Sequence, residues 1–396
     1  MLALMGVALV LTGCARVRPG IDVLLSDSLP VVRDRRVGLL TNQSGVDAHG
    51  VGDVERLRGA GVRLVAIFSP EHGFRGAADP GAAVASSTDS ATGLPIYSLY
   101  GPTSAPTDAM LDGIDVMLVD LQDAGARYFT YLSTTVEVMR AAGRRGIRVV
   151  VLDRPNPIGG AVQGNVLDTA FASFVGRIAV PMRHGLTLGE LARLAAADLA
   201  TGPAPTVVPV ASWRRAELYD ATGLPFVPPS PNLRSLESLL HYPGLCLFEG
   251  TNLSVGRGSA APFEQIGAPW LDTTQVLAAL AREPLPGVAV EAVAFTPRHP
   301  GDGKYADTAV AGLHLRITDR RRYDAPAAAV RLLALLRHIH PGTFRFSSPQ
   351  FDRLAGGPAL RNALEAGVPP GQIIDGWRAP TDRFVARRAP FLLYHP

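Results

Sequence analysis

Two short, almost wholly apolar runs constrain the fold of this chain more than any other feature of its sequence. IDVMLVD at 114–120 and IRVVVLD at 147–153 are rich in β-branched and aliphatic residues and lack the alternation of a half-exposed strand. Such runs are typical of parallel strands that are covered on both faces. Three further strands are predicted at 37–41, 63–69 and 95–100. The sequence therefore predicts a buried sheet.

Helical patterns that end at glycine separate these strands. VGDVERLRGAG at 51–61 and STTVEVMRAAGRRG at 133–146 are the clearest. Strands that alternate with helices predict an α/β fold with a Rossmann-like, doubly wound parallel sheet. The rest of the chain mixes strands and helices as a smaller α+β domain would. We predict an N-terminal catalytic domain at 20–256, a C-terminal domain at 257–396, and an active-site cleft between them.

Two threonines are each followed by a glutamate three residues later, which is the spacing of a helix capping box. The pairs are Thr134 with Glu137 and Thr187 with Glu190. We expect both glutamates to cap helix N-termini rather than to act in a site.

Polar side chains gather where the predicted strands end. Because ligands of open parallel sheets bind beyond the carboxyl ends of the strands, these residues are candidates for one common site. They are Asn42 and Gln43 after the first strand, Glu71, His72 and Arg75 after the second, Asp120, Gln122, Asp123, Arg127 and Tyr128 after the run at 114–120, and Arg154 and Asn156 after the last.

Several other classes of site are disfavoured. The first strand is followed by TNQSG rather than by a glycine-rich phosphate loop, and neither GxxxxGK[ST] nor GxSxG occurs. His338 and His340 have no acidic ligand nearby, so we predict neither a metal nor a cofactor. The net charge of +3 comes without a basic run, which argues against nucleic acid as a partner.

Carboxylates accompanied by amides, arginines and aromatic residues favour glycoside hydrolysis. This reaction needs one carboxylic acid to protonate the leaving oxygen and a second carboxylate as nucleophile or base. Glu71, in FSPEHGFRG, is the predicted acid, although a first-turn glutamate near a helix dipole is the alternative. Asp120, Asp123 and Glu249 are candidates for the second carboxylate, and either aspartate could instead cap a turn. The glycines after Glu71 would let the substrate approach.

Taken together, the motifs resemble the NamZ/YbbC family of exo-β-N-acetylmuramidases. They are GLLTNQSG, FSPEHGFRG, DLQDAGARYFTY, LDRPNP, PMRHGLTLGELA, SPNLRS, FEGTNLSVGRGS and FDRLAG, in consistent order between about Gly20 and Pro396. The resemblance implies a Rossmann-like domain, a smaller C-terminal domain and removal of N-acetylmuramic acid from the non-reducing end of peptidoglycan fragments. It places the family's catalytic glutamate at Glu71.

The resemblance also implies a muramyl saccharide as partner for the polar residues. Arg127, Arg154 or Arg257 could hold the lactyl carboxylate of muramic acid, and an internal ion pair is the alternative for each. Lys304, the only lysine, stands in a chain that otherwise uses arginine. The predicted substrate-binding residues are Asn42, Gln43, His72, Arg75, Gln122, Arg127, Tyr128, Arg154, Asn156, Asn252, Arg257 and Lys304.

The N-terminal run MLALMGVALVLTGC resembles the signal of a bacterial lipoprotein. It is shorter than the ~20 apolar residues of a membrane span and ends at Cys14 in the manner of a lipobox. We therefore predict a signal peptide at 1–14, lipidation of Cys14, and location in the cell envelope through a lipid anchor. Cys246 is expected to be a buried apolar residue.

One rival function remains open at this point. A lipid-anchored protein that captures muropeptides without cleaving them would use the same arginines and amides. It would not need a pair of carboxylates facing one another.

Overall fold

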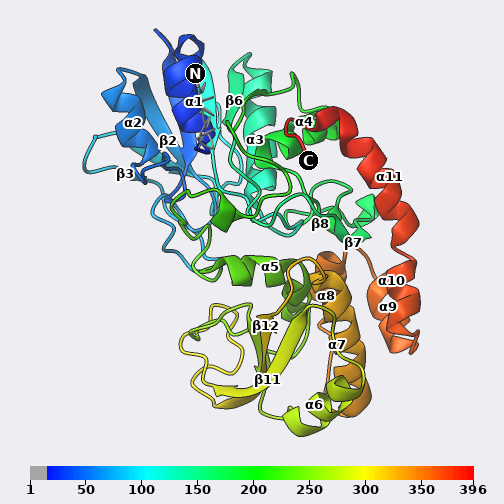
Figure 1. Ribbon diagram of the computed structural model, residues 1–396. Coiled ribbons are helices and arrows are strands. Elements are labelled where there is room, and N and C mark those ends of the chain that lie inside the picture. Colours follow the sequence, from blue (N-terminus) through cyan, green and yellow to red (C-terminus); the bar gives the residue numbers. More distant parts are fainter. Residues whose placement is uncertain (1–15) are drawn as a thin grey trace, which may run out of the picture.

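The computed structural model describes residues 16–396, so Cys14 and the predicted signal peptide lie outside the described residues. A seven-stranded sheet of order β3-β4-β2-β1-β5-β6-β9 forms the larger part (Figure 1). β3 pairs antiparallel with β4, and the other pairings are parallel. The strands are β1 (Arg36–Thr41), β2 (Arg63–Ser69), β3 (Ser87–Thr88), β4 (Pro95–Ser98), β5 (Val116–Asp120), β6 (Arg148–Leu152) and β9 (Thr206–Val208). The five predicted strands are confirmed.

Helices cover both faces of this sheet, as the apolar runs require. Val116 and Leu118 of β5 pack with α1 (Gly20–Asp27) and α2 (Asp53–Gly59). Met117 and Val119, which point the other way, pack with α3 (Tyr131–Arg144) and α4 (Leu188–Leu199). Because successive side chains of a strand point to opposite faces, both sets of apolar residues are buried. The doubly wound fold class is confirmed.

Of the two predicted capping boxes, the structure contains one. At α4, Thr187 and Glu190 form the reciprocal bonds of a capping box, so this prediction is confirmed. The prediction for Thr134 is wrong, since α3 begins one turn earlier, at Tyr131. Glu137 lies inside the helix and pairs with Arg140 and Arg177.

A smaller α+β part follows, built on a three-stranded antiparallel sheet of order β10-β12-β11. Helix α5 lies between the two parts in Figure 1 and packs on α7. The elements are α5 (Leu236–Leu245), η5 (Cys246–Gly250), β10 (Gln265–Ala268), α6 (Thr273–Arg282), β11 (Val288–Phe295), β12 (Val310–Ile317), α7 (Ala325–Ile339), α8 (Ser348–Ala355), α9 (Ala359–Glu365) and α10 (Pro370–Asp375).

The end of the chain returns to the larger part. Helix α11 (Arg378–Arg388) packs on the short strand β7 (Gln163–Val166), which pairs with β8 (Pro181–Arg183) (Figure 1). Beyond α11, the hydroxyl of Tyr394 donates to Asp153, which follows β6. The C-terminal segment therefore ties the two parts together.

A buried charge cluster holds the carboxyl edge of the large sheet. Arg154, after β6, forms an ion pair with Asp120 at the end of β5 and donates to the carbonyl oxygen of Val46 at 2.8 Å. Asp53 at the start of α2 lies 3.8 Å from Arg154 and accepts a hydrogen bond from Thr41. Burial, and then the charge of Asp120, raises the pKa of Asp53 well above its ordinary value. Asp53 and Asp120 thus share one guanidinium, and burial disfavours the charged form of both carboxyl groups.

Replacing the guanidinium of this cluster should destabilise the fold. In Arg154→Ala the carboxylate of Asp120 stays buried without its partner, so the free energy of unfolding should fall by about 3–5 kcal/mol. Denaturant unfolding of the chain from Ala15 onward measures this. Arg75→Ala is the matched control, because the Arg75 side chain is 76% exposed and its removal should change stability by less than ~0.5 kcal/mol. Equal effects of the two substitutions would contradict the assigned role.

Candidate active site

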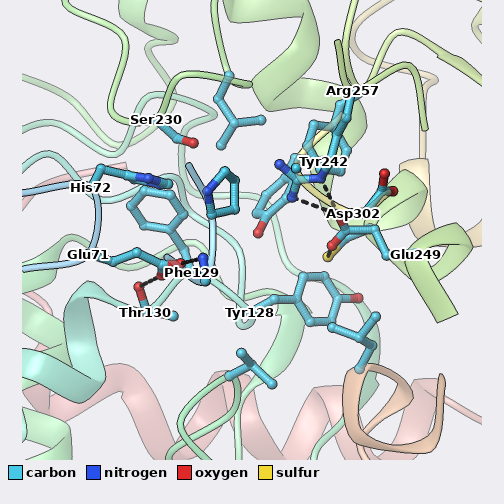
Figure 2. Close-up of a pocket in the computed structure, with 18 of the residues that line it drawn as sticks. Glu71, His72, Tyr128, Phe129, Thr130, Ser230, Tyr242, Glu249, Arg257 and Asp302 are labelled. Atoms are coloured by element: carbon cyan, nitrogen blue, oxygen red, sulfur yellow. Dashed lines mark hydrogen bonds and ion pairs between the residues drawn. The ribbon is translucent and has the colours of Figure 1, made fainter. Parts of the chain in front are cut away.

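A cavity of about 270 Å³ lies where the loops of the large sheet meet the smaller part. Figure 2 shows Glu71 and His72 on one side and Glu249, Arg257 and Asp302 on the opposite side. Of the sequence-predicted residues, the cavity is lined by Glu71, His72, Tyr128, Glu249 and Arg257. It is lined by both parts of the chain, so residues far apart in the sequence complete one site.

Glu71 is held in one orientation at the end of β2. Pro70 follows the strand, and the carboxylate that comes next is almost wholly buried. The backbone N–H of Gly81 donates to Oε1 at 2.9 Å, and the hydroxyl of Thr130 donates to Oε2 at 2.7 Å (Figure 2). Since a hydroxyl can donate or accept, Thr130 can bond either the ionised or the protonated form of Glu71.

His72 completes this side of the cavity as a neutral ring. Its Nδ1 lies 2.8 Å from the carbonyl oxygen of Ala78, which can only accept, so Nδ1 carries the hydrogen. Burial lowers the pKa of His72, although the charge of Glu71 acts in the opposite direction. The neutral ring therefore keeps a lone pair on Nε2 that can accept a hydrogen bond from a ligand hydroxyl.

The turn after Glu71 explains its glycines. His72, Gly73 and Gly76 all have left-handed backbone angles, with φ of 70°, 76° and 66°. A Cβ on Gly76 would lie 2.0 Å from the side chain of Gln43. Neither glycine lines the cavity. Turn geometry and packing require them, so the expectation that they admit the substrate is wrong.

Glu249 and Arg257 form an ion pair on the opposite wall. Arg257 Nε donates to Glu249 Oε1 at 2.6 Å, and the guanidinium lies over the ring of Phe263 at 4.9 Å. Nη1 of Arg257 is buried and has no hydrogen-bond partner among residues 16–396. The guanidinium is thus fixed by one carboxylate and retains a free donor for an acidic ligand. Cys246 is buried, as predicted, and its Sγ lies 3.6 Å from Glu249 Oε2.

Asp302 is a third cavity carboxylate that sequence reasoning missed. Its Oδ1 accepts a hydrogen bond from the backbone N–H of Lys304, while Oδ2 is buried and has no partner in the part of the chain that the structure describes. Its loop approaches the loop beside Glu71, because a Cβ on Gly301 would lie 3.4 Å from Pro80. Asp302 follows β11 of the smaller sheet, and no motif set it apart. Its one available signal was its place in GDGKYAD, beside the only lysine.

Lys304, predicted to bind substrate, bonds to backbone carbonyl oxygens of the protein instead. Its Nζ donates to the carbonyl oxygens of Phe248, Glu249 and Leu253 at 3.4, 2.9 and 3.0 Å. It does not line the cavity. Lys304 therefore fixes the segment that carries Glu249.

Aromatic rings form the floor between the two acidic walls. Tyr128 donates to the carbonyl oxygen of Pro243 at 2.9 Å, and its ring stands edge-on to Tyr242 at 6.1 Å. Phe129 also meets Tyr242 edge-on, at 6.3 Å. Figure 2 shows these rings between Glu71 and Arg257. They offer an apolar surface to one face of a sugar ring.

Two of the predicted second carboxylates do not line this cavity. Asp120 is paired with Arg154 in the buried cluster. Asp123 accepts the N–H of Gly125 at 2.7 Å and lies 3.7 Å from His184. Burial raises the pKa of Asp123 to about 7. Both aspartates thus stabilise loops at the sheet edge.

The predicted amides likewise bond within the protein. Asn42 donates to Tyr131, Gln43 to the carbonyl of Pro228, Gln122 to those of Asp123 and Pro155, Asn156 to that of Leu186, and Asn252 to that of Thr343. Asn42, Gln43 and Arg75 line a separate cavity of about 300 Å³ beside Asp53. These side chains tie loops together at a distance from the cavity of Glu71.

Arg127, another predicted substrate-binding residue, bonds within the protein. Its guanidinium donates to the carbonyl oxygens of Asn165, Val180 and Leu354. Arg257 is consequently the one of the three predicted carboxylate-binding arginines that lines the cavity. Within residues 16–396, no cluster of histidine, cysteine and acidic side chains could hold a metal ion.

The fold and the cavity define a two-part α/β protein with the acidic, aromatic-lined site that glycosidases use. A family model described as exo-beta-N-acetylmuramidase NamZ, N-terminal, matches residues 37–237, and its C-terminal counterpart matches 240–394. The chain belongs to this NamZ family. The two matches meet at 237–240, upstream of the domain boundary at 256–257 predicted from the sequence.

Individual relatives are similar to this chain over nearly its whole length. It is 40% identical to the peptidoglycan beta-N-acetylmuramidase NamZ of Bacillus subtilis (strain 168), over 96% of this chain and 92% of that protein. Among solved structures, it resembles two DUF1343 family proteins of Bacteroides fragilis NCTC 9343. One is 33% identical with a TM-score of 0.87, and the other is 30% identical with a TM-score of 0.78. Each comparison covers 96% of this chain and 99% of the other.

Removing the ammonium of Lys304 should loosen the wall that carries Glu249. In Lys304→Met the carbonyls of Phe248, Glu249 and Leu253 lose a charged donor, so the free energy of unfolding should fall by about 2–3 kcal/mol. Denaturant unfolding again measures the change. Arg298→Met removes a cation from the same region whose side chain is 67% exposed, and should cost less than ~1 kcal/mol. A Lys304→Met protein as stable as this control would rule out the bonding role.

Proposed function

We propose that this chain is an exo-acting glycosidase that releases N-acetylmuramic acid from the non-reducing end of peptidoglycan fragments. The observation that carries the proposal is a carboxyl group, Glu71, held by two hydrogen bonds in a cavity whose opposite wall is acidic. The peptidoglycan beta-N-acetylmuramidase among its relatives supports the same reaction.

In this reaction Glu71 gives its proton to the glycosidic oxygen as the bond from that oxygen to the anomeric carbon breaks. Water supplies the oxygen that replaces the leaving saccharide, and its proton passes to a carboxylate. Negative charge on the far wall stabilises the positive charge that develops on the sugar ring. The products are free N-acetylmuramic acid and a saccharide shortened by one residue.

Asp302 is the better candidate for the second carboxylate. Oε1 of Glu249 is already bonded to Arg257. Asp302 has one oxygen, Oδ2, that none of the described residues bonds. Its separation from Glu71 when substrate is bound determines the stereochemistry, ~5–5.5 Å for retention and ~6.5–9.5 Å for inversion.

Arg257 gives the site its preference for muramic acid. The lactyl group of this sugar ends in a carboxylate, and the free Nη1 of Arg257 matches it in charge and in hydrogen bonding. The cavity of about 270 Å³ lies just below the range of ~300–1,000 Å³ for small-molecule sites. It therefore suits one terminal sugar better than the interior of a polymer.

A cell-envelope location belongs to the same proposal. The lipobox-like sequence ending at Cys14 supports a lipid anchor, and peptidoglycan fragments occur outside the cytoplasmic membrane. In residues 16–396, no helix combines the length and the apolar character needed to cross a bilayer.

Neutralising Glu71 tests the reaction and its acid together. Glu71→Gln should lower the release of N-acetylmuramic acid from a MurNAc-GlcNAc disaccharide by about 10²–10⁴-fold, because the proton donor is lost. Chromatography of the released sugar measures the rate, and Glu55→Gln, on the exposed side of α2, should leave it unchanged. Equal release by the Glu71 variant and the parent would move the acid elsewhere. Binding of the disaccharide without release by either would favour the capture protein.

A second substitution tests whether Asp302 or Glu249 is the second carboxylate of the reaction. Asp302→Asn should lower kcat about 100-fold or more with little change in stability, while Asp307→Asn, whose side chain is 57% exposed, should match the parent. Steady-state kinetics with the disaccharide provide the comparison. Full activity of Asp302→Asn together with inactivity of a folded Glu249→Gln would assign the role to Glu249.

A further inference from the structure

A second hollow adjoins the cavity of Glu71 and has no role in the reaction as described so far. Its volume is about 360 Å³, and it shares Gly81 and Tyr100 with the first cavity. The lining residues are Gly81, Ala83, Tyr100, Gly101, Ser104 and Phe174. The two cavities are thus neighbours that meet at one boundary.

The boundary lies at the acid itself. Gly81 donates its N–H to the carboxylate of Glu71. Burial, and then the negative charge of Glu71, raises the pKa of Tyr100 to about 12, so Tyr100 is a protonated phenol close to that carboxylate. Any atom that Glu71 protonates therefore lies close to the two residues that line both cavities.

The walls of the hollow are fixed by the backbone. Val84 donates its N–H to the carbonyl oxygen of Tyr100 at 2.7 Å, and Leu99 donates to that of Ser69, the last residue of β2, at 2.9 Å. The hollow is consequently built onto the same strand end that positions Glu71, and it keeps its place relative to the acid.

The two cavities differ in charge. Glu71, Glu249, Arg257 and Asp302 line the first, whereas the six residues that line the second are uncharged. The rings of Tyr100 and Phe174 lie 6.1 Å apart with their planes at 52°. The second hollow therefore offers aromatic surface and no counter-charge, which suits a neutral sugar better than an acidic one.

We propose that this hollow is the subsite for the leaving saccharide, and that it receives the N-acetylglucosamine residue next to the bond that is cleaved. This inference rests on the proposed function. The acidic sugar occupies the charged cavity, the neutral sugar occupies the uncharged hollow, and the oxygen between them lies at Glu71. Arg257, the one arginine that lines the charged cavity, supplies the counter-charge for the acidic sugar, and the lining of the hollow supplies none.

Two donors with the same acidic sugar test the assignment. N-acetylmuramic acid β-fluoride has a single-atom leaving group and does not need the hollow, while MurNAc-GlcNAc does. Ser104→Trp fills the hollow and Phe174→Ala removes its aromatic wall. Each should lower kcat/KM for the disaccharide by about 10–100-fold and leave that for the fluoride within about twofold. Phe171→Ala, an exposed phenylalanine outside the hollow, is the matched control and should affect neither.

The possible outcomes distinguish failure of the subsite assignment from failure of the proposed glycosidase function. Loss on the disaccharide alone, in both hollow variants, supports the subsite. Equal loss on both donors, or full activity of both variants on the disaccharide, overturns it while the glycosidase function stands. If the unmodified chain hydrolyses neither donor, the proposed function falls and the subsite falls with it.

Discussion

The parallel pairing of β1 with β2 on one side and β5 on the other is the constraint on which the site depends. It brings the loops after β1, β2, β5 and β6 to one edge of the sheet. Polar groups at such an edge are buried by the helices on both faces, and each must find a partner. Most do so within the protein, as Arg154 does with Asp120. Glu71 differs because its partners, Gly81 and Thr130, hold it without neutralising it.

The fold could be predicted from the sequence because it is encoded locally. Apolar runs marked β5 and β6, and alternate residues of β5 pack on opposite faces. The position of Glu71 after β2 could be predicted for the same reason. The start of α3 could not, because the hydroxyl of its N-cap residue, Thr130, bonds the distant Glu71 and not the helix.

The roles of the remaining polar residues depended on contacts between distant segments. Asp120, Asp123 and the amides had the right residue types at the right edge, but the sequence does not show which of them satisfy each other. Asp302 comes from the other part of the chain, and only folding brings it to the cavity. The preference of Arg127 for three backbone carbonyls is likewise a property of the tertiary structure.

Lys304 has a chemical consequence that goes beyond its bonds. It is the only side-chain amine in the sequence, and its ammonium is engaged by three carbonyl oxygens of the wall that carries Glu249. An acylating reagent must reach this nitrogen, and burial behind three carbonyl contacts prevents that while the wall is intact. The rate at which Nζ of Lys304 is acylated therefore reports how often the wall opens. The residue that stabilises this wall is thus also a chemical probe of its opening.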